Sequence, residues 1–179
     1  MELREFLVIG HRAVTAPKFS LNDLPGGAGR MDILCRCVNA ALFLSHDLRR
    51  DTRIHLLLLG PPAPPAVITF DGALVKYLNP DERSAASLIQ KAIEHGEGES
   101  TPGVFVSRHR FEEAIAGRKL IYLHEAGEDI RNAEVDENAI FVLGDHLGLT
   151  QEEEALLEKN RAKKLSVGPE KYHAEHCIT

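Results

Sequence analysis

Compact apolar runs alternate with segments of helical periodicity along most of the chain. The apolar runs predict strands at residues 5–10, 53–60, 66–70, 73–78, 104–107, 119–124, 139–143 and 164–167. Helical spacing and capping signals predict helices at residues 31–45, 80–95, 111–116 and 151–159, and a final helix that starts at Pro169. Strands that alternate with helices are typical of an α/β fold with a mostly parallel sheet flanked by helices.

Two short segments set the predicted organisation of the chain. Asp71-Gly72 separates the predicted strands 66–70 and 73–78, and this dipeptide is typical of a tight hairpin turn. Residues 96–103 are rich in glycine and glutamate and form the least structured internal stretch. We therefore expect a single domain over residues 1–179, with a boundary there between two halves, about 1–98 and about 99–179.

The composition is that of a globular protein. Of the 179 residues, 44% are hydrophobic and 27% are charged. Three cysteines, Cys35, Cys37 and Cys177, indicate a reducing compartment and no disulfide framework. The first residues lead into a short apolar run without a signal peptide, and no apolar stretch is long enough to cross a bilayer. These features predict a cytoplasmic protein with no membrane partner.

Charge is distributed unevenly along the chain. The net charge of −6 argues against unselective binding to polyanions. Residues 1–53 carry 8 Lys and Arg against 6 Asp and Glu, a net of +2, and residues 54–179 carry 13 against 21, a net of −8. The first part contains Arg30, Arg36, Arg49, Arg50 and Arg53. These arginines are candidate phosphate contacts, because a guanidinium group binds phosphate oxygens in pairs. The alternative is a solvated helix face with ion pairs to Asp32, Asp47 and Asp51.

Three glycine-containing segments follow predicted strands in the second half, at residues 122–127, 142–148 and 165–169. Ligands of parallel sheets bind beyond the carboxyl ends of the strands, so these segments together predict a pocket for a polar, flat ligand. Each glycine taken alone is better explained by a simple turn, and only the three segments together favour a pocket. The chain contains no dinucleotide or phosphate-loop fingerprint and no Gly-x-Ser-x-Gly nucleophile motif.

A second cluster lies near the end of the chain. His173, His176 and Cys177 share one face at helical spacing, and with a fourth ligand such as His146 they could form a metal site. No Cys-x-x-Cys or His-Glu-x-x-His motif accompanies them. We therefore expect no metal.

Several motifs follow one another in order along nearly the whole chain. The most specific group is Asp23-Leu24-Pro25-Gly26, Gly29-Arg30, Cys35-Arg36-Cys37 and Phe43-Leu44-Ser45-His46-Asp47-Leu48-Arg49. Later motifs are Asn79-Pro80-Asp81-Glu82-Arg83, Ser100-Thr101-Pro102-Gly103, Leu143-Gly144-Asp145-His146-Leu147-Gly148, Leu165-Ser166-Val167-Gly168-Pro169 and His173-Ala174-Glu175-His176-Cys177-Ile178. Together they resemble the archaeal-type tRNA pseudouridine-54 N1-methyltransferases, the TrmY family.

This resemblance implies a SPOUT-class fold whose C-terminal part forms a deep trefoil knot, an exception to the rule that chains do not knot. It also implies a homodimer that uses S-adenosyl-L-methionine to methylate N1 of pseudouridine 54 in the T-loop of tRNA. The family's last helix is expected to continue beyond Thr179. By the same resemblance, the methyl donor is lined by Leu123, Gly144, Leu165, Ser166, Val167, Gly168 and Cys177.

The implied reaction needs a group to accept the N1 proton or to orient the base, a role for a carboxylate. Asp32 and Asp81 lie in the matched motifs and are the candidates. The alternatives are an ion pair between Asp32 and Arg36 and a helix cap at Asp81. On the same implication, tRNA phosphates or the target base would be contacted by Arg30, Arg36, Arg49 and Arg53. Because few phosphates are neutralised, binding to tRNA should depend only weakly on salt.

Two other functions stay open at this point. Another SPOUT enzyme that methylates pseudouridine in ribosomal RNA would need the same fold and the same cofactor loops. A non-catalytic module that binds RNA or a nucleotide would use the arginines and the glycine-containing loops without any methyl transfer.

Overall fold

The protein is described here by a computed structural model that places residues 2–179. The strands are β1 (Arg4–Gly10), β2 (Thr52–Leu58), β3 (Ala66–Asp71), β4 (Gly98–Thr101), β5 (Val104–Ser107), β6 (Leu120–Asp129), β7 (Ile140–Gly144) and β8 (Lys163–Ser166). The helices are α1 (Met31–Leu42), α2 (Glu82–His95), α3 (Phe111–Ile115), α4 (Gln151–Lys159), α5 (Ala174–Ile178) and the 3-10 helix η1 (Ile130–Asn132). Within residues 2–179, none of the helices has the length and apolar character needed to span a bilayer.

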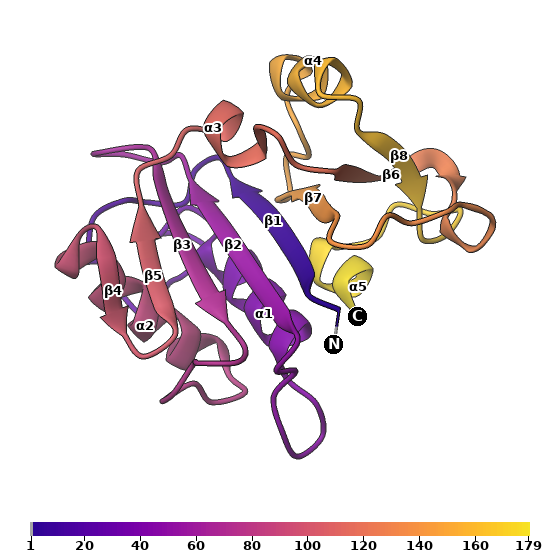
Figure 1. Cartoon of the computed structure of the whole chain (residues 1–179). Helices are drawn as coiled ribbons and strands as arrows, with labels where there is room; N and C mark the ends of the chain where they lie inside the picture. The colour runs from indigo at the N-terminus through magenta and orange to yellow at the C-terminus, as the bar shows by residue number, and fades with distance from the viewer. Residues whose placement is uncertain (1) are drawn as a thin grey trace.

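All eight strands form one sheet in the order β4-β5-β3-β2-β1-β7-β6-β8 (Figure 1). β1 pairs in parallel with β2 and β7, and β6 pairs in parallel with β7 and β8. β3, β5 and β4 extend the sheet through antiparallel pairs. The predicted α/β fold with a mostly parallel sheet is therefore confirmed. β1 is central, and its residues Leu7, Val8 and Ile9 are at most 1% exposed, as expected for a strand covered on both faces.

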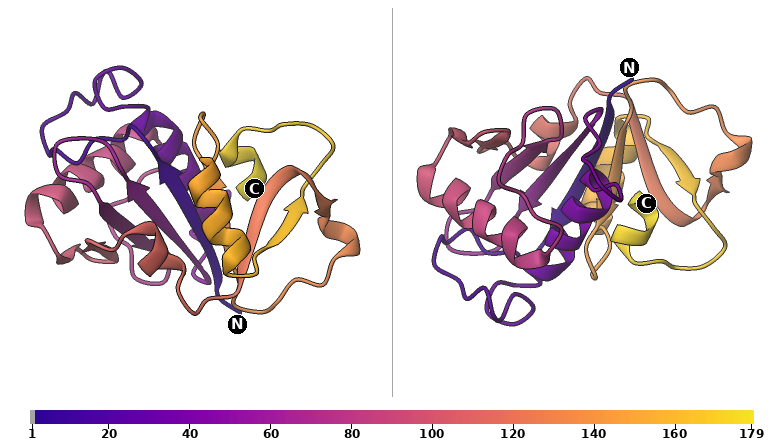
Figure 2. Two further views of the ribbon diagram at one scale, coloured as in Figure 1. Left: turned by 90° about the horizontal axis from the view of Figure 1, so that it is seen from above. Right: turned by 90° about the horizontal axis from the view of Figure 1, so that it is seen from below.

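Helices cover both faces of the sheet (Figure 2). Phe6 and Val8 of β1 pack in one apolar cluster with α1, α2 and Ile178 of α5. Leu7 and Ile9 point to the other face and pack in a second cluster with α3 and α4. This alternation follows from the period of two along a strand. α5, at the end of the chain, packs against α1 and lies near the carboxyl ends of β7 and β8.

The predicted hairpin at Asp71-Gly72 is wrong. β3 ends at Asp71, and residues 73–78 form no strand. The Asp71 carboxylate accepts a hydrogen bond from the backbone N–H of Ala73 at 2.9 Å, which turns the chain away from the sheet. The free edge of β3 is paired with β5 instead.

Three other predicted boundaries also differ from the structure. Residues 96–103 are not an unstructured stretch, because they contain β4, which forms a hairpin with β5. α1 ends at Leu42 rather than at residue 45, since Phe43 is extended and pairs with Leu48. The last helix begins at Ala174 rather than at Pro169.

Candidate functional site

A cavity of about 430 Å³ lies beside the middle of β6 and at the carboxyl ends of β7 and β8. Its walls are residues 122–125 of β6, where the pairing with β8 becomes irregular after Leu123, residues 143–149 at the end of β7 and after it, and residues 166–168 with 170–174 at the end of β8 and after it. Ile33 of α1, Glu154 of α4 and Cys177 of α5 complete the lining. Small-molecule sites commonly have volumes of about 300–1,000 Å³. Residues of all three glycine-containing segments therefore line one pocket, as predicted, although residues 122–127 lie within β6 rather than after a strand.

Most of the residues expected to contact the methyl donor line this cavity. They are Leu123, Gly144, Ser166, Val167, Gly168 and Cys177. Leu165 is not among the lining residues, and it is only 2% exposed. Its backbone packs against Gly127, where a Cβ atom would lie 2.6 Å from the Leu165 carbonyl carbon.

Residues 145–150, which we call the β7–α4 loop, turn back tightly onto the end of β7. A Cβ atom at Gly144 would lie 2.5 Å from both the carbonyl carbon and the carbonyl oxygen of Gly148. Gly148 itself has a φ of 69°, a left-handed conformation that glycine adopts without steric strain. The absence of a side chain at Gly144 thus sets how closely this loop approaches the strand.

Acidic side chains outnumber basic ones around the cavity. The carboxylates in the lining are Glu125, Asp145, Glu154 and Glu170, and the one ammonium group in it is Lys171. The hydroxyl of Tyr122 donates to Glu154 Oε1 at 2.8 Å, so this carboxylate is held at the wall. A lining of this composition favours a ligand with positive charge.

His11 lies between two carboxylates beside the cavity. It is the first residue after β1, and Asp145 is the first residue after the neighbouring strand β7. The ring Nδ1 lies 3.1 Å from Asp145 Oδ1, and Nε2 lies 2.6 Å from Glu153 Oε1. Hydrogen bonds with Asp145 and then with Glu153 raise the pKa of His11 to about 9, although burial acts in the opposite direction. His11 is therefore a cation at neutral pH.

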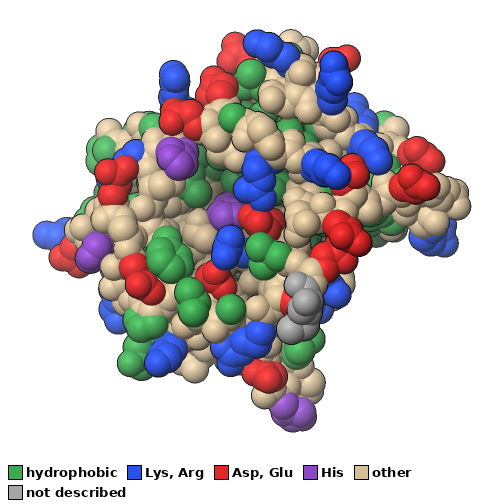
Figure 3. Space-filling view, in the orientation of Figure 1, with side chains coloured by type: hydrophobic (Ala, Val, Ile, Leu, Met, Phe, Trp, Pro, Cys, Tyr) green, Lys and Arg blue, Asp and Glu red, His purple; other side chains and the backbone are tan. Residues whose placement is uncertain are grey.

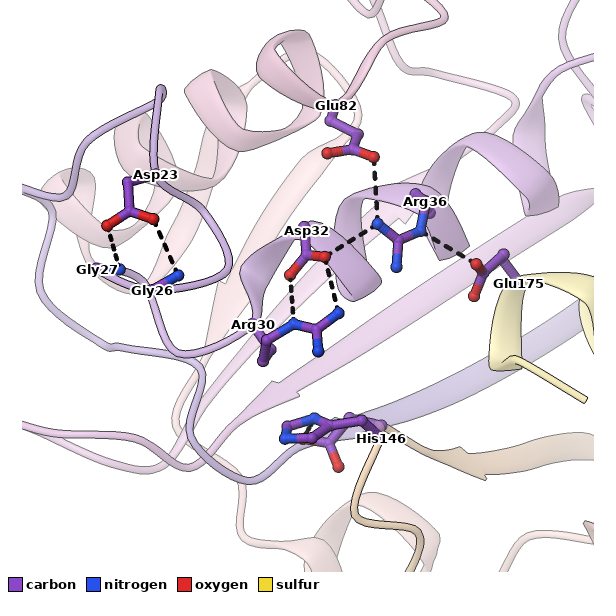
Figure 4. A network of polar contacts seen from close by, with 10 residues as sticks. Asp23, Gly26, Gly27, Arg30, Asp32, Arg36, Glu82, His146 and Glu175 are labelled. Carbon is purple, nitrogen blue, oxygen red and sulfur yellow. Dashed lines mark hydrogen bonds and ion pairs between the residues drawn. The ribbon is translucent and has the colours of Figure 1, made fainter.

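A second charged cluster surrounds the start of α1 (Figure 4). Nε and Nη2 of Arg30 donate to the two carboxylate oxygens of Asp32, each at 3.0 Å, and Nη1 of Arg36 donates to Asp32 Oδ2 at 2.9 Å. Arg36 also contacts Glu82 at 3.3 Å and Glu175 of α5 at 3.1 Å. The predicted alternative of an Asp32–Arg36 ion pair is thus present in the structure. Burial alone would raise the pKa of Asp32, but the two arginines lower it.

The other two predicted RNA-binding arginines lie away from this cluster. Arg49 donates to the carbonyl of Ala40 at 2.9 Å, at the end of α1, whereas Arg30 precedes its start. The length of α1, roughly 18 Å, separates them. Arg53 on β2 pairs with Asp71 at 2.7 Å. These arginines therefore do not form one continuous cluster. On the face of the molecule shown in Figure 3, basic and acidic side chains are interspersed.

Asp81 and the terminal histidines have mainly local contacts. Asp81 is the N-cap of α2, where its Oδ1 accepts the backbone N–H of Ser84 at 2.7 Å, as the alternative reading of this residue predicted. The rings of His173 and His176 meet edge to face with centroids 5.6 Å apart. Across residues 2–179, no group of three or more His, Cys, Asp or Glu side chains is placed to hold a metal ion.

Neither His11 nor Glu153 was among the predicted site residues. A usable signal existed for His11, because it directly follows a predicted strand and a glycine, as the three glycine-containing segments do. For Glu153 the only sequence signal is Thr150-x-x-Glu153, which is typical of a capping box. The structure contains that capping box at the start of α4. Its contact with His11 spans 142 residues and depends on the fold.

Comparison with known proteins assigns the class of this fold and pocket. Residues 3–179 match the family described as "Putative SAM-dependent RNA methyltransferase", and the chain belongs to this family. The fold is similar to that of a solved structure, Archaeoglobus fulgidus Nep1 bound to S-adenosylhomocysteine, with a TM-score of 0.67 over 99% of this chain and 94% of that one. The sequence identity to that structure is 14%, so this likeness concerns the fold alone.

Sequence relatives point to a particular activity within the family. A protein of Methanocella arvoryzae is 61% identical, covering 98% of this chain and 95% of its own length. A protein of Haloferax volcanii is 46% identical, covering 99% and 93%. Both are named tRNA (pseudouridine(54)-N(1))-methyltransferase. The resemblance inferred from the motifs is thereby confirmed at the level of the family.

Proposed function

We propose that this protein transfers the methyl group of S-adenosyl-L-methionine to N1 of pseudouridine 54 in the T-loop of tRNA. The observation that carries the proposal is the 430 Å³ cavity beside β6 at the carboxyl ends of β7 and β8, in a chain that matches an RNA methyltransferase family over residues 3–179. The named relatives, which are 41–61% identical over nearly the whole chain, support the choice of nucleotide. A tRNA substrate also supports a cytoplasmic location.

The residues of the cavity fit the methyl donor. S-adenosyl-L-methionine has a positively charged sulfonium and amino group against a single carboxylate, so its net charge is positive and the acidic lining complements it. When bound, it supplies a methyl group on an electron-poor sulfur. We assign its contacts to Leu123, Gly144, Leu165, Ser166, Val167, Gly168 and Cys177, with Leu165 contributing its backbone. No metal is required, because the protein's task is to align nitrogen, methyl carbon and sulfur.

We assign different tasks to the two candidate carboxylates. Asp32 accepts hydrogen bonds from Arg30 and Arg36, which favour its charged form and make it a weak base. Its proposed task is to orient Arg30 toward the substrate. Asp81 is exposed, and its cap uses one oxygen, so its carboxylate remains accessible to accept the N1 proton.

Contacts with tRNA are assigned to Arg30, Arg36, Arg49 and Arg53. Each of these guanidinium groups has a partner within the protein. Arg30 and Arg36 belong to the start and the middle of α1, Arg49 contacts its end, and Arg53 lies on β2. Binding phosphate would require each arginine to exchange or share that partner. We therefore propose selective binding that relies on the shape of the folded T-loop and depends weakly on salt.

We further propose that the chain forms a homodimer. A hollow of about 660 Å³ beside the cofactor cavity has an apolar lining that supports this assembly. Leu123, Val167, Tyr172 and Cys177 line both the hollow and the cavity, so a partner seated there would reach the edge of the cofactor site. The test is the mass in solution, measured by sedimentation, which should be twice 19.8 kDa.

A trefoil knot in the C-terminal part is also part of the proposal. It is supported by the position of β6, which lies between β7 and β8 although it precedes both in the chain. The path after β8 supports it as well, because the chain returns from the edge of the sheet to pack α5 against α1. When the two termini are pulled apart in a single-molecule experiment, a knotted chain should extend to less than its full contour length.

The activity is tested by transfer of tritium from labelled S-adenosyl-L-methionine to two tRNAs that differ at one nucleotide. The tRNA with pseudouridine at position 54 should be labelled, and the same tRNA with uridine should not, because uridine has no free N1–H. Equal labelling would contradict the choice of nucleotide. Labelling of ribosomal RNA in place of tRNA would assign the enzyme to that substrate, and binding of the donor without transfer would indicate a binding module.

A further inference from the structure

The His11 ring lies between two carboxylates, an arrangement that favours its charged form. Its Nδ1 faces Asp145 at 3.1 Å and its Nε2 faces Glu153 at 2.6 Å and 2.9 Å. A neutral imidazole has one N–H and one lone pair, so it can donate to only one of these carboxylates and would repel the other. Only the imidazolium form donates to both. This conclusion follows from the positions of the two carboxylates alone.

The two carboxylates stand at the two ends of the β7–α4 loop, which forms one wall of the cavity. Asp145 begins the loop, and its Oδ1 also accepts the backbone N–H of Leu147 at 3.0 Å. Glu153, in the first turn of α4, holds the other end of the loop, because its Oε2 accepts a hydrogen bond from the backbone N–H of Thr150, the N-cap of α4, at 3.2 Å. The backbone N–H of His11 donates to Asp145 Oδ2 at 2.9 Å. One residue after β1 therefore holds both ends of the loop.

We propose that His11 is a positioning residue for the methyl donor, and that its charged ring, held between Asp145 and Glu153, fixes the β7–α4 loop in the shape that binds the cofactor. This inference rests on the proposed function, since it takes the ligand of the cavity to be S-adenosyl-L-methionine. His11 does not line the cavity itself, so its effect on the ligand passes through the loop.

Few other charges act on this cluster. His146 Nδ1 lies 3.8 Å from Asp145 Oδ2, and Arg30 interacts with Asp145 at longer range from the start of α1. Burial raises the pKa of Asp145, but hydrogen bonds from His11 and from the backbone outweigh that effect and lower it. Loss of the His11 charge would leave the carboxylates of Asp145 and Glu153 on opposite sides of one neutral ring. The resulting repulsion would open the loop.

The first test compares two histidine variants at pH 7. His11→Gln keeps a side chain that can donate one hydrogen bond but removes the charge. His55→Gln is the matched control, because His55 is likewise mostly buried and pairs with a glutamate, Glu5, at 2.8 Å, in a cleft on another part of the sheet. We expect the KM for the methyl donor to rise about tenfold in His11→Gln while kcat changes less than threefold, and both to stay at wild-type values in His55→Gln.

The second test uses pH and a double variant. The ratio of the donor's dissociation constants for His11→Gln and wild type cancels the titration of the donor's own amino group. That ratio should be about ten at pH 7 and approach one above pH 9, where wild-type His11 is neutral as well. Replacing Glu153 by glutamine in addition to His11→Gln should recover part of the affinity, because one repelling charge is removed.

The outcomes separate this inference from the proposed function. If wild type does not bind the donor in calorimetry, both fail. If wild type binds and the His11→Gln KM is unchanged, or the ratio of dissociation constants does not vary with pH, only the role of His11 is overturned. If His11→Gln loses kcat at an unchanged KM, the role is likewise overturned. If His11→Gln does not fold, the pKa of the His11 ring is measured in wild type from its ¹⁵N shifts, with and without donor. Donor binding must raise this pKa, and an unchanged pKa would overturn the role of His11.

Discussion

Replacing Gly144 by alanine should weaken binding of the methyl donor by displacing the β7–α4 loop. The new Cβ atom would lie 2.5 Å from the carbonyl carbon and oxygen of Gly148, whereas ordinary contacts begin at 3.4 Å. The loop must therefore move by about 0.9 Å, the difference between these two distances. Because the contact is with backbone, a change of side-chain rotamer cannot relieve it.

The size of the effect follows from the cost of overpacking, which is typically about 1–3 kcal/mol. If the whole cost falls on the bound state, the dissociation constant rises by roughly fivefold to 150-fold, since about 1.4 kcal/mol corresponds to a factor of ten. If the loop is equally strained without ligand, the cost instead appears as a lower Tm. Calorimetry with S-adenosyl-L-methionine and thermal unfolding of the same samples measure the two shares.

Gly72→Ala is the matched control for this prediction. Its Cβ atom would lie 2.1 Å from the carbonyl oxygen of Arg49 and 2.7 Å from that of Thr52, so the steric conflict is at least as severe. Gly72 follows β3 and is not among the residues that line the cavity. This variant should lower the Tm and leave the donor's dissociation constant unchanged. Wild-type affinity together with a wild-type Tm in Gly144→Ala would refute the steric argument. An equal loss of affinity in Gly72→Ala would refute its link to the cavity.

Four further outcomes follow from the charged groups. Asp32→Asn leaves Arg30 and Arg36 without their shared carboxylate, so the free energy of unfolding in urea titrations should fall by up to about 3 kcal/mol. An unchanged free energy of unfolding would show that the ion pairs do not stabilise the fold. Asp81→Ser keeps a helix cap without the carboxylate, so the Tm should hold while kcat falls at least tenfold; retained kcat would assign Asp81 to capping alone. Burial raises the pKa of Glu5, but hydrogen bonds and charges of His55 and Arg118 lower it to about 2. The free energy of unfolding that Glu5 contributes above pH 4.5 should therefore be lost as the pH falls toward 2, by about 3 kcal/mol in total. Glu5→Gln should remove this pH dependence. The logarithm of the tRNA binding constant should fall with the logarithm of salt concentration with a slope no steeper than about −3.5, as expected for four arginines, and a slope near −10 would contradict the assignment.

The sequence alone determined the features that depend on residues close together in the chain. The apolar run of β1 predicted a buried strand, and Asp81 was correctly identified as a possible cap because its partner, Ser84, is three residues away. The pocket was also predictable in outline, since glycine-containing segments after parallel strands meet at one edge of a sheet. Recognition of the family required more than these patterns, namely the order of specific motifs along the chain.

Only the tertiary structure decided which distant residues meet. His11 and Asp145 are 134 residues apart and touch because β1 and β7 are neighbours in the sheet, and Arg36 reaches Glu175, 139 residues away, because α5 packs on α1. The failed hairpin at Asp71-Gly72 has the same origin, since β5 rather than residues 73–78 pairs with β3. Local patterns specify the turn and the strand, but the pairing of strands depends on which arrangement buries the most apolar surface across the whole sheet.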